Sequence, residues 1–349
     1  MDVTPVTQFS DFEYLTYPHS NGWVDNGAAI ILARRGPTTT AFVRHDVESG
    51  QATVLAEVSH AKNDARCVYF DVAGDVLACL SELTLYTLDL RNASAKPHAV
   101  FTFPADTKYC ELCSLHPAGT HVLVHAHIEG RHRCWEFSLH DGTHKELWSS
   151  DWYANHFHYV PHNPALIGFS HEGPAHEIAD RAWVFTAGAP ETARCVFDLS
   201  HLPVEKRLNI GHELWAHHAD TGLAVAYVGS KGRPRGLYEI YADGRPARLV
   251  SEGDRDWHSN ISRDGKLAVT DTSAPISRPD IEFSPADAGS DIVLIDMATG
   301  ARRVIAHTLS TPHHPAHPHP VFSPDGKWVY FNQSEPGNQR YRVCRVEIA

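Results

Sequence analysis

The first 33 residues of this 349-residue chain contain neither lysine nor arginine, and no long apolar run follows them. A secretory signal combines a basic start with an apolar stretch, and both features are missing here. The longest candidate run, AAIILA at residues 28–33, is far shorter than the roughly 20 apolar residues that a membrane span needs. We therefore expect a cytoplasmic protein without a membrane partner.

Cysteine is also scarce. The chain has seven scattered cysteines, and an odd number suits free thiols in a reducing compartment. Cys110 and Cys113 have the spacing of a metal or redox pair, but no second pair accompanies them. We interpret these two residues as buried structural thiols.

Positive charge is in short supply, because 30 Lys and Arg residues face 42 Asp and Glu residues, a net charge of −12. This balance argues against nucleic acid or an anionic membrane as a partner. No Gly-rich phosphate loop and no G-x-S-x-G elbow is present, so the sequence offers neither a nucleotide site nor a serine nucleophile. Hydrophobic residues make up 42% of the chain, enough for a substantial core.

What the chain does contain is a repeat. A turn flanked by short runs of alternating apolar and polar residues recurs seven times, a pattern typical of β-hairpins. The turns centre on Gly27, Gly74, Gly119, Pro164, Gly222, Gly265 and Gly326. A second strand–Gly turn–strand motif, such as LYEIYADGRPARLV at 237–250, follows several of them.

Successive turns are 47, 45, 45, 58, 43 and 61 residues apart, close to the period of β-propeller blades with four strands each. A pair of β-sandwiches is the alternative, but seven equivalent turns would then be a coincidence. We predict an all-β fold, a single seven-bladed β-propeller that spans residues 1–349. The final segment, 341–349, leaves the last blade one strand short, so we expect the chain before residue 20 to supply that strand and close the ring.

Histidines are unusually frequent, with 26 in the chain, and several occupy equivalent places in the repeat. The first strand of each propeller blade lines the central channel, so residues at similar distances before each turn lie at a similar level. Five histidines precede their turns by seven to ten residues: His156, His212, His258, His317 and His319. Arg66, eight residues before Gly74, shares this position.

The densest group lies at residues 310–320, where four histidines alternate with four prolines. His317 and His319 are two residues apart and face the same way on an extended segment, while His314 lies three residues before His317. Converging neutral imidazoles favour a divalent first-row metal, and a scattered polar lining of the channel is the alternative. By contrast, we expect His132, His144 and His201 at the surface.

Four segments resemble those of the oligogalacturonate lyases, seven-bladed propellers that cleave short pectin fragments. They are GFSHEGPAHEIADRAW at 168–183, GHELW at 211–215, WHSNISRDG at 257–265 and HPAHPHPVFSPDG at 314–326. The resemblance covers roughly residues 150–349, and the first half matches only through the repeat. It implies His212 as the catalytic base, Arg181 as a catalytic residue, and His258, His314, His317 and His319 as metal ligands.

The family has glutamine where His314 stands here. Four imidazoles in place of three and an amide could shift the preferred ion away from Mn²⁺, although Mn²⁺ is the expected cofactor. The implied reaction is β-elimination in a small anionic uronate oligosaccharide, in which a base removes the C5 proton while the metal holds the adjacent carboxylate. Arg181 would either grip a substrate carboxylate or lower the pKa of His212.

We expect His156, His171 and Arg66 to contact the substrate. Two other interpretations stay open at the level of the sequence. One keeps the metal and the base but changes the substrate to another uronide, such as one that contains glucuronate. The other is a non-catalytic scaffold that binds proteins, as many propellers do. Converging histidines argue against the scaffold, because a docking surface has no use for them.

Overall fold

The short alternating runs of the sequence form antiparallel strands in the computed structural model, which describes residues 2–60, 67–92, 95–283, 289–309, 317–335 and 340–348. Three short 3-10 helices are the only helices in these ranges: η1 (Phe9–Asp11), η2 (Asp25–Gly27) and η3 (Val204–Lys206). None of the helices in the described ranges has the length and apolarity needed to cross a membrane. The prediction of an all-β chain is confirmed.

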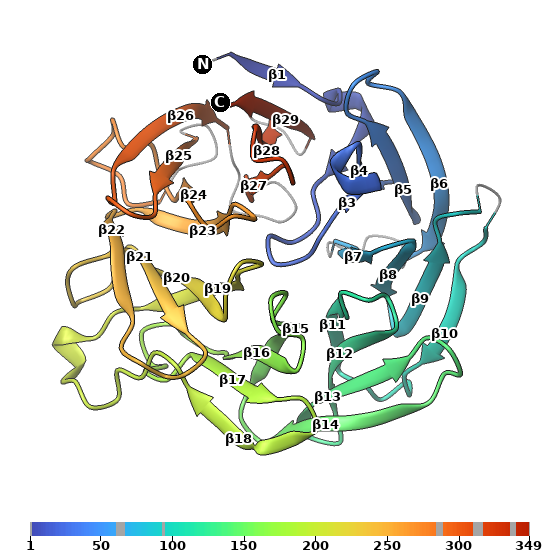
Figure 1. Ribbon diagram of the computed structural model, residues 1–349, viewed down its shortest axis with the longest axis horizontal. Helices are drawn as coiled ribbons and strands as arrows, with labels where there is room; N and C mark the ends of the chain where they lie inside the picture. Colours follow the sequence, from blue (N-terminus) through green and yellow to red (C-terminus); the bar gives the residue numbers. More distant parts are fainter. Residues whose placement is uncertain are drawn as a thin grey trace.

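The strands form seven sheets arranged as a ring around a central channel (Figure 1). The first sheet comprises β2 (Glu13–Tyr14), β3 (Trp23–Val24), β4 (Ala29–Arg35), β5 (Thr39–Asp46) and β6 (Ala52–Ser59). The second comprises β7 (Phe70–Ala73), β8 (Val76–Ser81), β9 (Thr84–Asp89) and β10 (His98–Thr102). The third comprises β11 (Tyr109–Leu115), β12 (His121–Ile128), β13 (Arg131–Ser138) and β14 (His144–Ser150).

The fourth sheet comprises β15 (Ala154–Tyr159), β16 (Leu166–His171), β17 (Ala182–Thr186) and β18 (Ala189–Cys195). The fifth comprises β19 (Ile210–Trp215), β20 (Thr221–Ala226), β21 (Gly236–Tyr241) and β22 (Arg248–Glu252). The sixth comprises β23 (Asp256–Ile261), β24 (Leu267–Thr272), β25 (Ser290–Asp296) and β26 (Arg302–Thr308). In each of them the first strand lies innermost (Figure 1).

The seventh sheet joins the two ends of the chain. It contains β27 (Val321–Phe322), β28 (Trp328–Ser334), β29 (Tyr341–Glu347) and, as its outer strand, β1 (Val3–Pro5). β1 pairs antiparallel with β29, with Val3 opposite Val346. The expected closure of the ring by an N-terminal strand is therefore confirmed.

The turns lie where the sequence places them, with one exception. Gly222 is the second residue of β20, opposite Trp215, so the turn itself precedes it. The glycine at 265 fits its turn for two reasons. Its φ of +72° favours glycine, and a Cβ there would lie 2.3 Å from the ring of His218.

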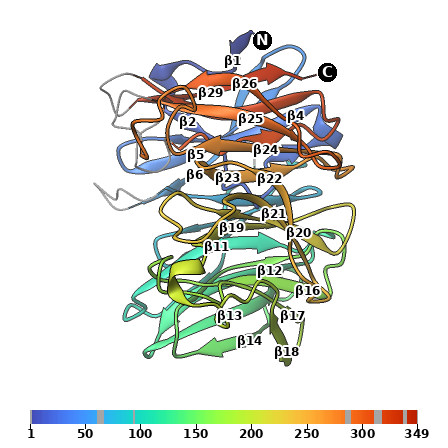
Figure 2. The same ribbon diagram turned by 90° about the vertical axis from the view of Figure 1, so that its left-hand side faces the viewer.

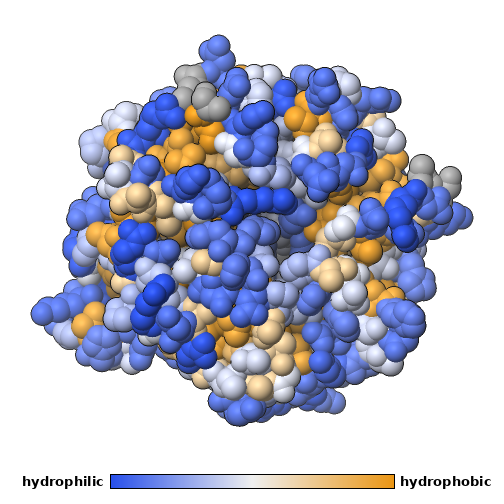
Figure 3. Space-filling view, viewed as in Figure 1, coloured by the Kyte–Doolittle hydropathy of each residue, from blue (hydrophilic) through white to orange (hydrophobic). Residues whose placement is uncertain are grey.

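Neighbouring sheets face each other around the ring (Figure 2), and the core lies mainly in the seams between them. One buried cluster, for example, joins Val269 and Ile292 of one sheet to Val329, Phe331 and Val346 of the next. Outside the seams the ring face seen in Figure 3 is mostly hydrophilic, with small apolar patches. Packing between blades thus fixes the angles at which the inner strands meet the channel.

A segment that the sequence did not reveal enters the channel. The inner strand of the first blade is split, because β2 and β3 pair with opposite ends of β4 and residues 15–22 lie between them. This segment reaches toward the middle of the ring (Figure 1). The Leu15 amide donates to Asn332 (2.9 Å), and Asn260 donates to the carbonyl of Pro18 (3.1 Å). We call residues 15–22 the channel segment.

Candidate active site

Three inner strands carry a histidine at the same position. His156, His212 and His258 are the third residues of β15, β19 and β23. Each strand has a bulge there, with two residues opposite one residue of the partner strand. A bulge re-aims a side chain, and equivalent bulges bring these imidazoles to one level of the channel.

The backbone is strained at three of the site histidines. His156, His212 and His319 have φ values of 56°, 53° and 45°, in the left-handed region. This conformation costs a residue with a Cβ about 1–2 kcal/mol. Such strain persists where packing over-determines it and clusters at functional sites, so it marks this end of the channel independently of the residue types.

His258, His317 and His319 form a compact group. One ligand nitrogen from each lies within 4.8 Å of the others, and all three side chains are buried. The predicted convergence of His317 and His319 with a histidine from the preceding blade is thus present in the structure. Buried imidazoles at this spacing fit a divalent first-row metal. We call these residues the histidine triad.

Asp271 supports the triad. It lies on β24 opposite the bulge of β23, and its carboxylate accepts from the backbone amide of His258 (2.7 Å) and from the ring Nδ1 of His258 (2.8 Å). The same carboxylate accepts from the backbone amide of His319 (3.2 Å). A proton on Nδ1 leaves Nε2 of His258 as the lone pair for a metal, an arrangement that commonly orients metal-bound histidines. Burial raises the pKa of Asp271 to about 7.

His212 lies beside the triad without belonging to it. Its ring centroid is 4.1 Å from that of His258, and its Nδ1 lies 3.0 Å from the hydroxyl of Tyr17 in the channel segment. Burial lowers the pKa of His212 well below its ordinary value, and His258 and Arg181 add to the effect. With Nδ1 engaged by Tyr17, Nε2 is the nitrogen left for a substrate.

Arg181 is held by two carboxylates. Its Nη2 contacts Glu172 at 2.5 Å and its Nε contacts Glu213 at 3.1 Å. Burial alone would lower the pKa of Arg181, but Glu213 and Glu172 outweigh it and raise the pKa. Two of its three nitrogens are thus occupied, so a substrate carboxylate would meet mainly Nη1 rather than an unengaged two-pronged guanidinium.

The other substrate candidates differ in position. The ring of His156 packs edge-on against Tyr17 at 5.4 Å, and its Nε2 lies 3.7 Å from Glu172. His171 ends β16, the second strand of its blade, and its Nδ1 lies 2.9 Å from Asp180. The predictions for Arg66 and His314 fall outside the described residues.

One expectation about surface histidines is wrong. His144 and His201 are exposed, whereas His132 is buried, with 6% of its surface accessible. Its ring stacks between those of His127 (4.2 Å) and Tyr153 (4.8 Å). A residue beside the β12–β13 turn looks exposed in the sequence, but Tyr153 from the next blade covers it.

Sequence reasoning missed four polar residues of the site: Tyr17, Glu172, Glu213 and Asp271. Two of them had a signal, because Glu172 and Glu213 directly follow the predicted His171 and His212. Asp271 interrupts the otherwise uncharged strand LAVTDT, which is also a signal. Tyr17 had none, since its place depends on the split inner strand.

His158, on the same strand as His156, predicts a pH dependence of stability. Its Nδ1 donates to the carbonyl of His156 (2.7 Å), and burial lowers its pKa to about 4. As the pH falls, His158 is therefore protonated in the unfolded chain before it is protonated in the folded protein. The free energy of unfolding then falls as the pH drops from about 6.5 to 4. The expected loss is about 3 kcal/mol.

Denaturant titrations at several pH values test this expectation. His158→Gln keeps a donor for the His156 carbonyl but does not titrate, so it should lose about 3 kcal/mol less than the wild type across this range. Parallel stability curves for the two proteins would contradict the assignment.

Comparison with known proteins supports the resemblance seen in the motifs. No family model matches the chain. The oligogalacturonate lyase of Dickeya dadantii strain 3937 is 27% identical over 197 residues, which are 54% of this chain and 48% of that enzyme. The chain thus matches about half the length of this relative.

Two solved structures are similar over 99% of this chain and 93% of their own chains. One is an oligogalacturonate lyase from Vibrio parahaemolyticus, with a TM-score of 0.81 and 17% identity. The other is an oligogalacturonate lyase in complex with manganese, with a TM-score of 0.80 and 18% identity. At these identities the likeness establishes the shared fold.

Proposed function

We propose that this protein is a metal-dependent lyase that cleaves short uronate oligosaccharides, such as oligogalacturonates and digalacturonate, by β-elimination. The observation that carries the proposal is the buried histidine triad with a separate imidazole, His212, against it. The similarity to oligogalacturonate lyases supports the substrate class. The manganese complex of one such enzyme supports Mn²⁺ as the ion.

The chemistry explains why both parts are needed. The C5 proton of a uronate is weakly acidic, because its removal adds charge next to a carboxylate. A bound divalent metal supplies Lewis-acid stabilisation of that charge, worth several kcal/mol. His258, His317 and His319 would hold the ion, with His314 as the fourth imidazole. Asp271 would keep Nε2 of His258 directed at it.

His212 takes the role of the base in this proposal. In the tautomer that carries its proton on Nδ1, facing the Tyr17 hydroxyl, Nε2 is the nitrogen that would receive the C5 proton. As the C4–O bond breaks, the leaving oxygen gains a proton from solvent or from a neighbouring donor. Arg181, positioned by Glu172 and Glu213, offers Nη1 to a substrate carboxylate.

We assign substrate contacts to His156, His171 and Arg66. His156 is the best supported of these, because it shares the channel level of His212 and packs on Tyr17. His171 lies one strand farther out, so it would contact a sugar unit away from the cleaved bond.

Product formation tests the function. The protein is incubated with digalacturonate, and separately with a glucuronate-containing disaccharide, with Mn²⁺ or with chelator. We expect unsaturated or keto products from digalacturonate with Mn²⁺ and little product with chelator. Turnover of the glucuronate compound alone would keep the chemistry and change the substrate. No turnover of either uronide in any condition would favour a protein-binding scaffold.

Tyr17→Phe tests whether Tyr17 orients His212, the proposed base. The variant keeps the ring that packs against His156 but loses the hydrogen bond to Nδ1 of His212, so the imidazole is less firmly oriented. We expect kcat to fall about three- to tenfold, which corresponds to the usual net worth of one hydrogen bond, with little change in KM. An unchanged kcat would show that Tyr17 has no part in orienting His212.

A further inference from the structure

A hollow lies at the end of the channel opposite the triad. The triad and His212 lie at the beginnings of the inner strands, whereas a cavity of about 540 Å³ is lined by their ends, including Tyr159, Trp215, Ile261 and Phe322. The channel segment separates the two, because Tyr17 contacts His212 while Pro18 and Ser20 line the cavity. The volume is that of a typical small-molecule site.

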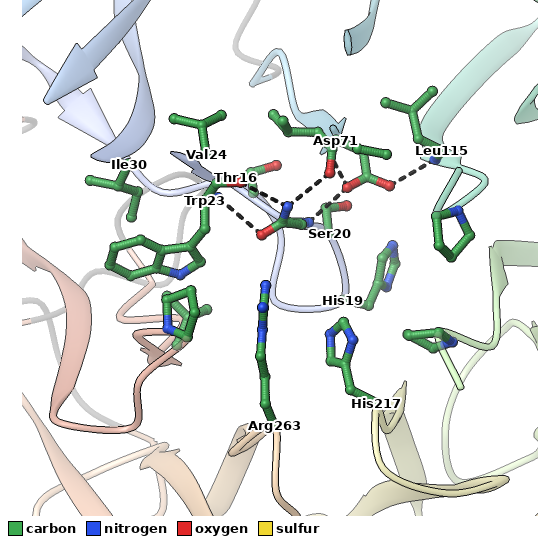
Figure 4. Close-up of a pocket in the computed structure, with 18 of the residues that line it drawn as sticks. Thr16, His19, Ser20, Trp23, Val24, Ile30, Asp71, Leu115, His217 and Arg263 are labelled. Carbon is green, nitrogen blue, oxygen red and sulfur yellow. Dashed lines mark hydrogen bonds between the residues drawn. The ribbon is translucent and has the colours of Figure 1, made fainter. Parts of the chain in front are cut away.

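A guanidinium projects into this cavity. Figure 4 shows Arg263 extending between Trp23 on one side and His19 and His217 on the other. The Arg263 side chain is exposed and has no ion pair or side-chain hydrogen bond with any residue of the described ranges, and partial desolvation lowers its pKa. Other exposed arginines, such as Arg233 and Arg278, pair with nearby aspartates.

The cavity offers a second donor. The indole N–H of Trp23 makes no hydrogen bond to any part of the chain that the structure describes, although its backbone amide donates to Asn21. His217 lies beside Arg263, and burial, with Arg263 and His218, lowers its pKa to about 4, so its ring is neutral near pH 7. Hydrogen-bond donors therefore face the hollow beside the permanent positive charge of Arg263.

The acidic residues that line the cavity do not neutralise Arg263. The buried carboxyl of Asp71 accepts three backbone amides, from Asn21, Val72 and Leu115 (Figure 4). Asp25 pairs with Arg44 at 2.6 Å. Asp75 is exposed at the rim, 4.0 Å from Arg91. None of these three carboxylates pairs with Arg263, so its N–H groups stay open to the cavity and to solvent.

We infer that this cavity binds a small organic anion, with its carboxylate or phosphate group on the guanidinium of Arg263. Guanidinium recognises both oxyanions through paired hydrogen bonds, and Trp23 supplies a further donor. The site lies across the channel segment from the triad and does not depend on the proposed lyase activity.

Calorimetric titration of the full chain with two probes, inorganic phosphate and galacturonate, tests this inference. Chelator is present, and His258→Ala serves as a second background, so that the triad cannot account for the signal. We expect at least one probe to bind, and Arg263→Gln to weaken that binding about tenfold or more. Arg278→Gln removes the same charge from an exposed ion pair and should leave binding unchanged.

The two probes identify the source of the anion. Binding of phosphate alone points to a phosphorylated metabolite, and binding of galacturonate alone points to a sugar acid. Arg263 makes no hydrogen bond that the fold needs, so the variant should melt at the wild-type temperature and lose only the stabilisation by the probe. The inference is overturned if neither probe binds the wild type, or if Arg263→Gln binds as tightly.

Discussion

Replacing His258 by alanine is expected to remove the metal and, with it, at least about a thousandfold of the turnover of digalacturonate. The triad supplies three nitrogens within 4.8 Å of one another, and alanine at this position leaves two. Lewis-acid stabilisation worth several kcal/mol is then lost, and each 1.36 kcal/mol is tenfold in rate. Metal content by atomic absorption and product formation are measured on the same sample.

Asp271→Asn provides a graded comparison. The amide keeps the shape of the side chain but binds the Nδ1–H of His258 less strongly, so the affinity for Mn²⁺ should fall about 10–100-fold. Excess Mn²⁺ should then restore turnover in Asp271→Asn and fail to do so in His258→Ala. If His258→Ala retains stoichiometric metal and full turnover, the triad is not the metal site.

The fold was predictable because its signal repeats. Seven hairpin turns at a nearly constant period specify a propeller even where individual strands are as short as β27. The spacing between each histidine and its turn also predicted the level of that histidine in the channel. Residues as distant in the sequence as His258 and His319 could therefore be assigned to one site. The error at Gly222 was one of local detail, since a glycine can begin a strand as well as make a turn.

The parts of the site that escaped prediction depend on geometry that one strand does not encode. A bulge places His258 against Asp271 of the neighbouring strand, and a pattern of alternation does not reveal which residue is the extra one. The channel segment is a stronger case, because the chain before residue 20 was expected only to supply the closing strand. Its hydrogen bonds to Asn260 and Asn332 come from blades at the other end of the chain.

The second large effect concerns His212. We expect His212→Ala to lower kcat on digalacturonate by about 10²–10⁴-fold, the usual contribution of a positioned general base. The metal content should stay at the wild-type level, because His212 packs against the ring of His258 but is not one of the three proposed ligands. Turnover and bound metal are therefore measured together.

This pairing of measurements separates the two roles that an imidazole can play here. The ring centroids of His212 and His258 lie only 4.1 Å apart, so a role for His212 as a further ligand has to be tested directly. If His212→Ala loses its metal, His212 is a ligand and the base must be sought elsewhere, with Tyr17 the nearest candidate. His144→Ala, at an exposed histidine far from the triad, controls for the loss of an imidazole and should match the wild type in both readings. If His212→Ala keeps full turnover, His212 is not the base. The assignment of the triad as the metal site would not be affected by that result.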